Sequence, residues 1–138
     1  MEWTHDGWNI FHLYALHAEG PCKIPWRQFL HLYLRIIPCV ECKLHFRKIV
    51  LGTNNARRAK QNGTFANSIE IRNRINRRLG KPDFNTLESY KYYQSFTRAE
   101  VAQTVKNFDT LLLKYLNDGY FTPQDYLKFT NAVSCLVN

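Results

Sequence analysis

The fold is decided by residues 25–42, which read PWRQFLHLYLRIIPCVEC. Pro25 can open a helix, because its fixed φ suits the first helical position. Pro38 ends or kinks that helix, because proline cannot continue the hydrogen-bond ladder. Between the two prolines an apolar stripe recurs at helical spacing, made of Trp26, Phe29, Leu30, Tyr33 and Ile37. The segment is therefore predicted as an amphipathic helix that leads directly into a Cys-x-x-Cys pair.

The neighbouring segments also have helical spacing, and none shows the sustained alternation of a strand. We expect helices over about residues 4–18, 38–51 and 66–79, the last stopping at a glycine. Residues 53–63 are polar and basic, so they are predicted as a loop, with a helical turn in its middle as the alternative.

Two further helices are indicated toward the C-terminus. Thr97 to Glu100 has the spacing of a capping box, and Thr122-Pro123 places proline at a first helical position. The predicted fold class is all-α, with residues 1–138 forming one domain. Its core is a four-helix bundle over about residues 4–84, and additional helices follow over about residues 86–138.

Length and composition limit the class of protein. The chain has 138 residues, of which 45% are hydrophobic and 22% charged, as in an ordinary globular domain. No apolar run approaches the roughly 20 residues needed to span a bilayer. Residues 1–9 lack the basic start and apolar stretch of a signal peptide. We therefore expect no membrane association and a cytoplasmic location, in the cytosol or a similar reducing compartment.

The net charge is +8, from 19 basic and 11 acidic residues. A basic surplus suits an anionic partner, such as a nucleic acid, a phosphate-bearing cofactor or an acidic protein. The basic clusters at residues 57–60 and 72–81 support one alternative function, a helical nucleic-acid-binding protein. A non-catalytic helical scaffold is a further alternative.

The cysteine pair has the features of a thiol–disulfide exchange site. Cys39 and Cys42 lie at i and i+3, directly after a proline and at the start of a predicted helix. A helix N-terminus stabilises a thiolate, and a lowered pKa makes cysteine an effective nucleophile. Positive charge follows closely, from Lys43, His45, Arg47 and Lys48.

The cysteine pair has three other interpretations. A zinc site needs four ligands, and Cys39, Cys42 and His45 supply three, with His31 or Cys22 as a fourth. However, no second ligand pair occurs at zinc-finger spacing, so no metal is expected. A thioredoxin-like domain would need strands beside the motif. Two buried, inert cysteines are the third interpretation.

Three stretches together carry a family resemblance. Trp8 to His12 is similar to a W-x-x-x-H motif, and Phe29 to Tyr33 leads on to Pro38 to Cys42. Asn73 to Phe84 is similar to H-N-x-V-N-x-x-L-G-K-P-x-F. In this order and spacing, over about residues 4–84, the chain resembles the Erv/ALR family of flavin-dependent sulfhydryl oxidases.

The resemblance implies a four-helix bundle that holds FAD beside the two cysteines. Cys39 would exchange with thiol-containing protein substrates, and Cys42 would pass the electrons to the flavin and then to oxygen, giving hydrogen peroxide. The implied cofactor contacts are Trp8, His12, His45, Arg72, Asn73, Asn76, Arg77, Lys81, Phe84 and Tyr93. Of these, Arg77 and Lys81 also belong to a basic stripe along the helix predicted over residues 66–79. A homodimer is also implied, for which Trp26 and Tyr33 are expected as exposed aromatic residues.

The chain departs from the family pattern at several places. Arg72 stands where the family usually has histidine, and Ile37 where it has an aromatic residue. Tyr92 or Tyr93 stands in place of a tryptophan that follows the G-K-P-x-F stretch in the family. His5 is the nearest match to an arginine that the family has ahead of its first tryptophan. This short form resembles the compact oxidases of large DNA viruses.

Two cysteines lie outside the motif. Cys22 follows Gly20-Pro21, and Cys135 lies near the end of the chain. They are expected to tie the C-terminal helix to the core as a disulfide, to act separately as electron shuttles, or to stay free.

Overall fold

The computed structural model describes residues 3–52 and 54–138, and the regular structure in those two ranges is helical throughout. The predicted all-α class is confirmed. None of these helices has the length and apolar character needed to cross a membrane. The elements are α1 (Trp3–His17), α2 (Trp26–Arg35), α3 (Val40–Gly52), α4 (Asn55–Asn62), α5 (Thr64–Arg78), α6 (Thr86–Gln94), α7 (Arg98–Asn117), α8 (Pro123–Val133) and the short 3₁₀ helix η1 (Ser134–Leu136).

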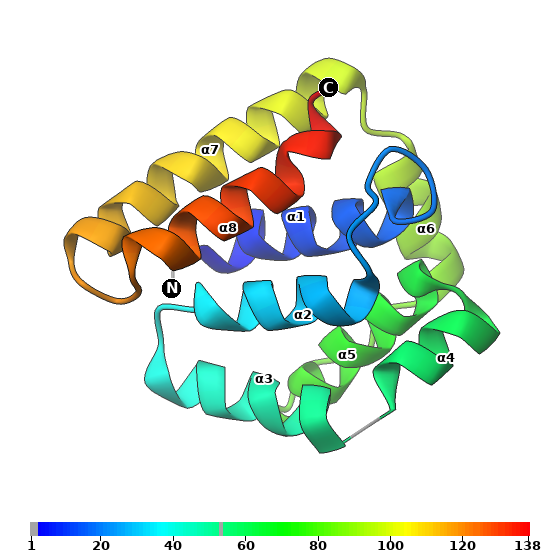
Figure 1. The fold of residues 1–138 in the computed structure, drawn as a ribbon. Helices are drawn as coiled ribbons and strands as arrows, with labels where there is room; N and C mark the ends of the chain where they lie inside the picture. The colour runs from blue at the N-terminus through cyan, green and yellow to red at the C-terminus, as the bar shows by residue number, and fades with distance from the viewer. Residues whose placement is uncertain (1–2, 53) are drawn as a thin grey trace.

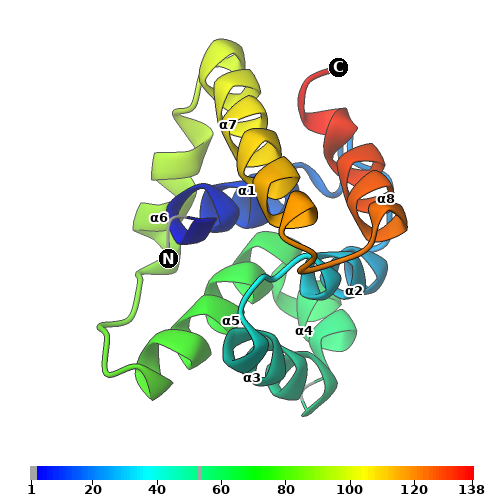
Figure 2. The same cartoon turned by 90° about the vertical axis from the view of Figure 1, so that its left-hand side faces the viewer.

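Helices α1 and α2 lie in the middle of the molecule (Figure 1). On one side α7 packs along α1 and α8 along α2. On the other side lie α3, α4 and α5, and α6 packs against α1 and α5. The view turned by 90° shows the same separation, with α7 and α8 on one side of α1 and α2 and with α3 and α5 on the other (Figure 2). The first three predicted helices and the one over residues 66–79 correspond to α1, α2, α3 and α5.

Aromatic side chains hold these helices together. Phe11 of α1 lies 4.8 Å from Tyr33 of α2, and Tyr33 lies 5.4 Å from Phe46 of α3, measured between ring centroids. Phe29 of α2 lies 6.0 Å from Phe129 of α8. Large rings of this kind contribute most of a small domain's apolar burial. The C-terminal helices therefore share one core with the N-terminal ones.

Local sequence signals set several helix ends as predicted. Thr97 and Glu100 form a complete capping box, in which the Thr97 hydroxyl accepts from the Glu100 N–H and the Glu100 carboxylate accepts from the Thr97 N–H. Thr122 and Asp125 do the same at the start of α8. Gly80, just beyond α5, has a φ of 72°, which glycine adopts without a steric penalty.

The predicted loop over residues 53–63 is wrong for most of its length, although Thr53 lies outside the described residues. Helix α4 fills residues 55–62 and packs against α5. The Asn54 side chain caps it by accepting from the Arg57 N–H at 3.2 Å. Ala59 is buried against the core. Residues 56–61 are good helix formers, so local propensity and packing against α5 both favour this helix.

Helix α6 was not predicted. Asn85 caps it, with its side-chain oxygen accepting from the Glu88 N–H at 2.9 Å. Tyr93 is the main buried residue of this short helix, because only 5% of it is exposed. A helix with so few buried positions shows little periodicity, which explains the missing sequence signal.

The expected exposure of Trp26 and Tyr33 is wrong. Trp26 is 7% exposed, and its indole N–H donates to the Asn67 side-chain oxygen at 2.7 Å. Tyr33 is fully buried among the core aromatics. Their stripe on α2 faces the bundle interior, so these two residues are not available to a partner subunit.

Cys22 and Cys135 form a disulfide with a sequence separation of 113 residues. Cys22 lies in the connection between α1 and α2, where it is fully buried, and Cys135 lies in η1. Of the three expected arrangements, the structure shows the one in which the C-terminal end is tied to the core.

Replacing both cysteines, as in Cys22→Ala/Cys135→Ala, is expected to lower the free energy of unfolding by about 2–4 kcal/mol, because the closed loop limits the unfolded chain. Urea denaturation of the oxidised chain and of the variant measures this difference. Reduced wild-type chain serves as the matched control and should unfold near the variant. Equal midpoints for the oxidised chain and the variant would contradict a stabilising role.

Candidate active site

The two remaining cysteines lie at the start of α3. Both are free thiols, and Cys42 is the more exposed. Cys39 directly precedes the first residue of α3, and its sulfur accepts the backbone N–H of Cys42 at 3.3 Å. Cys39 therefore occupies the place of a capping residue, where a helix end offers unpaired N–H groups. This confirms the predicted position of the pair at a helix N-terminus.

The electrostatics of Cys42 differ from the sequence-based expectation. Its pKa is raised to about 11, first by partial burial and then by its hydrogen bond to Cys39 and the charge of Cys39. The expected lowering by the helix N-terminus is not found at this thiol. Burial of the Cys42 thiol is the larger cause of the raised pKa, and the neighbouring Cys39 sulfur adds to it by disfavouring a second negative charge beside it. In the reduced pair, Cys42 therefore keeps its proton at neutral pH.

A cavity of about 470 Å³ opens beside Cys42. It lies between α1, α2, α3, α5 and the loop that follows α5. The predicted site residues that line it are Trp8, Cys42, His45, Arg72, Asn76, Lys81 and Phe84. Residues of the wall that sequence reasoning did not assign to the site are His5, Tyr33, Ile37, Phe46, Ile75, Leu79, Pro82 and Asp83.

Most of the missed wall residues are apolar. Ile75 and Leu79 share an apolar stripe of their helix, and such a stripe gives no signal that separates core from cavity wall. Cys39 lies outside the lining, whereas Cys42 belongs to it. The two sulfurs of the pair thus have different surroundings.

Arg72 gives the cavity a positive charge. Its guanidinium lies 4.1 Å from the ring centroid of Phe84 and 5.2 Å from that of Trp8, so it lies close to both aromatic rings. Its Nε is buried and has no hydrogen-bond partner among the described residues. None of their carboxylates lies within ion-pair distance of it either. Burial lowers the pKa of Arg72, and an anionic ligand would offset that cost.

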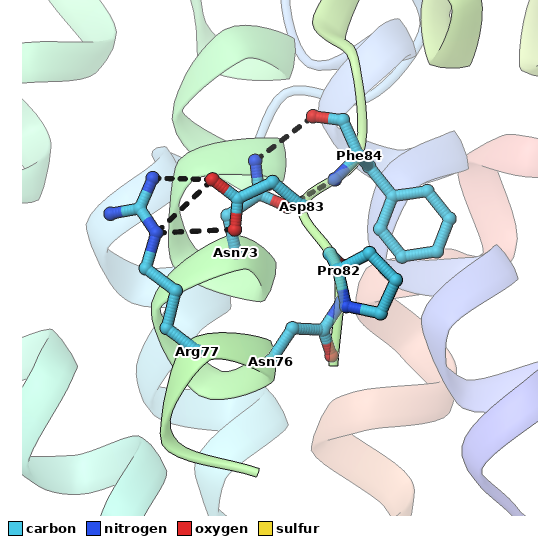
Figure 3. Close-up of polar contacts among 6 residues, drawn as sticks. All are labelled: Asn73, Asn76, Arg77, Pro82, Asp83 and Phe84. Carbon is cyan, nitrogen blue, oxygen red and sulfur yellow. Dashed lines mark hydrogen bonds and ion pairs between the residues drawn. The ribbon is translucent and has the colours of Figure 1, made fainter. Parts of the chain in front are cut away.

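The loop after α5 folds back along that helix, as Figure 3 shows. The Asn73 amide donates to the Phe84 carbonyl at 3.0 Å, and its oxygen accepts from the Phe84 N–H at 2.7 Å. Asn76 donates to the Pro82 carbonyl at 3.5 Å. Arg77 pairs with Asp83 at 2.6 Å and lowers the pKa of that carboxyl. These contacts hold the Phe84 ring at the cavity wall.

The Erv1/Alr family model matches residues 5–96, which is about two thirds of the chain. The chain belongs to the Erv1/Alr family. The matched range contains both the cysteine pair and the loop that ends at Phe84. Members of this family are thiol oxidases that generally bind FAD. No solved structure matches the chain.

The wall suits the flavin nucleotide that Erv1/Alr proteins use. Trp8 and Phe84 offer aromatic surface for a flat ring, and Ile75 adds apolar contact. The unpaired Arg72 Nε supplies a donor and a positive charge for an anionic group. Lys81 adds a second cation on the same wall. The donor set of the cavity therefore fits a phosphate-bearing aromatic cofactor.

Several predicted cofactor contacts lie outside this wall. Asn73 and Arg77 face the loop after α5, where their side chains are used to hold it. Tyr93 is buried and donates from its hydroxyl to the Asn9 oxygen at 2.9 Å. Their direct contact with a cofactor stays a prediction, and the structure gives them supporting positions.

His12 also lies behind the wall. Its ring stacks on that of Trp8, with centroids 5.8 Å apart and planes 17° apart. The Ser68 hydroxyl donates to the Phe65 carbonyl at 2.6 Å, so the His12 Nδ1, 2.9 Å from that hydroxyl, is the donor of the pair. His12 Nε2 is then an acceptor, buried and without a partner among the described residues. His12 thus supports Trp8 as a neutral ring.

Among the described residues, no group of three or more His, Cys, Asp or Glu side chains is placed to hold a metal ion. The zinc interpretation also loses Cys22 as a ligand, because that sulfur is disulfide-bonded. The nucleic-acid interpretation rests in part on the basic cluster at residues 57–60. Arg58 of that cluster pairs with Glu70 at 2.6 Å, so part of the cluster's charge is neutralised within the chain.

Acid is expected to destabilise the fold through His12. Burial first, and then the charge of Arg72, hold its pKa well below the usual value. The unfolded chain binds a proton at this residue below about pH 6.5 and the folded chain does not, so stability falls as the pH falls through that value.

Urea denaturation at about pH 7.5 and about pH 5.5 measures this dependence, with an expected loss from His12 of about 1 kcal/mol. His12→Gln should flatten it, and His5→Gln, a change at an exposed histidine of the same helix, serves as the control. An unchanged slope in His12→Gln would assign the acid sensitivity elsewhere.

Proposed function

We propose that the chain is an FAD-dependent sulfhydryl oxidase that forms disulfide bonds in protein substrates. The overall reaction converts two thiols and oxygen into a disulfide and hydrogen peroxide. One observation carries the proposal: Cys42 lines the cavity that suits the cofactor, whereas Cys39 lies off it. This difference supports separate roles for the two sulfurs, with Cys39 facing substrate and Cys42 facing FAD.

The thiol chemistry begins with the oxidised Cys39–Cys42 disulfide. A substrate thiolate attacks the Cys39 sulfur, and the Cys42 sulfur leaves and takes up a proton from solvent. A second substrate thiolate then attacks the sulfur of the first, and Cys39 leaves. The substrate gains one disulfide, and its two electrons now reside on the reduced pair. The N–H of Cys42, in the first turn of α3, donates to the Cys39 sulfur and would stabilise that sulfur as it departs.

When bound, FAD supplies the redox step, since it accepts two electrons from the dithiol and passes them to oxygen. Trp8 and Phe84 would pack against its flat rings. Arg72 and Lys81 would bind its anionic groups. The loop held by Asn73 and Asn76 would keep Phe84 in place for this contact.

Homodimerisation and a place among compact viral oxidases are proposed from the family resemblance alone. A cytoplasmic location is proposed from the sequence pattern of residues 1–9 and the lack of a long apolar run. A dimer would have to use surfaces other than Trp26 and Tyr33, since both are buried. Analytical ultracentrifugation tests the dimer directly.

The role of Cys42 can be tested by its spectrum. The purified chain should carry bound FAD, and Cys42→Ser should retain it, because the rest of the wall is unchanged. Anaerobic dithiothreitol should bleach the flavin of Cys42→Ser at least about a hundredfold more slowly than that of the wild type.

The control for this experiment is Cys22→Ala/Cys135→Ala, which removes the other pair and should bleach at the wild-type rate. Bleaching of Cys42→Ser at the wild-type rate would refute the proposed electron path. A chain that binds no FAD would refute the oxidase function.

Arg72→Met is expected to weaken FAD binding about tenfold or more, because a charge-assisted hydrogen bond is lost while a long, unbranched side chain is kept. Titration of the apoprotein with FAD, followed by flavin fluorescence, measures the dissociation constant. Arg78→Met is the matched control, since Arg78 is an exposed arginine of the same helix that does not line the cavity. Equal affinities for the two variants would exclude Arg72 as the cofactor's counter-charge.

A further inference from the structure

The outward side of α3 carries an unusual row of side chains. Val40 is 76% exposed, Leu44 51% and Leu51 61%. These residues lie at i, i+4 and i+11, so they fall on one face of the helix. Arg47 and Lys48 are exposed between them. We call these five residues the outer stripe.

The rest of the chain leaves the outer stripe uncovered. The opposite side of α3 supplies Phe46 and Val50 to the core, and the helix packs against α2 and α5. Figure 1 shows α3 at the edge of the molecule, below α2. A surface helix of a globular domain normally has one apolar face. The second one on α3 therefore needs another explanation, and exposed apolar patches of this kind mark interaction sites.

The outer stripe begins beside the sulfur that meets substrate. The Cys39 sulfur accepts the N–H of Cys42, so it lies at the N-terminal end of α3, next to Val40. From Val40 to Leu51 the helix rises about 17 Å. An extended peptide of about five residues has the same length. A segment that reaches Cys39 through its own cysteine can therefore lie along the whole stripe.

Charge indicates which occupant fits. Arg47 and Lys48 lie within the outer stripe, and Glu41 is the one acidic residue of α3. A second copy of this face would bring like charges together in a chain whose net charge is already +8. An acidic and apolar segment would instead pair with the cations and cover the leucines.

We propose that the outer stripe binds the substrate segment beside the attacked cysteine, and that the substrate class is proteins whose cysteine is flanked, within about five residues, by apolar and acidic side chains. The inference rests on the proposed oxidase function, because it treats Cys39 as the substrate-facing sulfur.

The test uses the exchange step without flavin or oxygen. In Cys42→Ser, Cys39 is the remaining unpaired cysteine, since Cys22 and Cys135 are disulfide-bonded. Treatment with Ellman's reagent converts Cys39 into a mixed disulfide with thionitrobenzoate. A peptide thiol then attacks the Cys39 sulfur, loses its proton to solvent and releases thionitrobenzoate, whose absorbance gives the rate. Because no cofactor takes part, failure of FAD binding and failure of this inference are separate results.

Three probes are compared: a cysteine peptide with leucine and glutamate neighbours, the same peptide with lysine for glutamate, and 2-mercaptoethanol. Rates are expressed relative to mercaptoethanol. We expect the acidic peptide to react about tenfold faster than the basic one, as the attraction of two cations for acidic side chains predicts. Added salt should reduce this ratio, because exposed charges are screened.

Variants of the outer stripe separate the contribution of its charge from that of its apolar side chains. Arg47→Glu/Lys48→Glu should reverse the peptide preference. Leu44→Gln/Leu51→Gln should slow both peptides about fivefold, through lost apolar burial. Leu44→Gln/Leu51→Gln should not change the mercaptoethanol rate, and the peptide rates of the charge variant are divided by its own mercaptoethanol rate. The matched control is Leu127→Gln/Lys128→Glu on α8, which alters an exposed leucine and lysine of another helix.

Two outcomes would overturn the proposal. One is a peptide preference that is absent in the wild-type background or that the outer-stripe variants leave unchanged. The other is that the outer-stripe variants sediment differently from the wild type while their peptide rates stay the same. That result would show that the outer stripe binds a second copy of the chain. Reversal by the charge variant, with the α8 control unchanged, supports it.

Discussion

The contact between Phe11 of α1, Tyr33 of α2 and Phe46 of α3 sets the position of everything around it. These rings are rigid and fully packed, so the three helices cannot shift independently. Tyr33 and Phe46 also reach the cavity wall, which makes the core and the site continuous. The start of α3, with its two cysteines, is therefore held at a fixed place over the cavity.

The cavity itself depends on a charge that the protein leaves uncompensated. An arginine between two aromatic rings would ordinarily be paired with a carboxylate, because burying a bare cation is costly. Here the nearby ion pair, between Arg77 and Asp83, is used to fix the loop after α5. The chain thus uses one arginine for structure, whereas Arg72, whose guanidinium bonds the Tyr93 hydroxyl, keeps its Nε without a partner among the described residues. Arg72, which departs from the usual family pattern, gives the cavity its chemical character.

Features set by neighbouring residues could be predicted from the sequence. The stripe of α2 and the capping boxes at Thr97 and Thr122 are local, and so is the place of the cysteines at a helix start. Helix α4 was missed because its short polar run has no apolar periodicity, although most of its residues are good helix formers. The partners of Asn73 could not be predicted either, since an amide that bonds a loop has the same sequence signal as one that bonds a ligand. The pairing of Cys22 with Cys135 spans 113 residues and leaves no local trace.

The burial of Cys22 has a consequence for a protein that handles thiols. Disulfide exchange requires a thiolate to approach a sulfur in line, so access determines which bonds can react. The Cys39 sulfur lies at a surface helix end, whereas Cys22 is fully covered by the core. Incoming thiols therefore have no access to the Cys22 sulfur, and the Cys22–Cys135 bond can be approached only from the partly buried Cys135 side. The cross-link between the C-terminal end and the core is thus shielded from thiols at one of its two sulfurs.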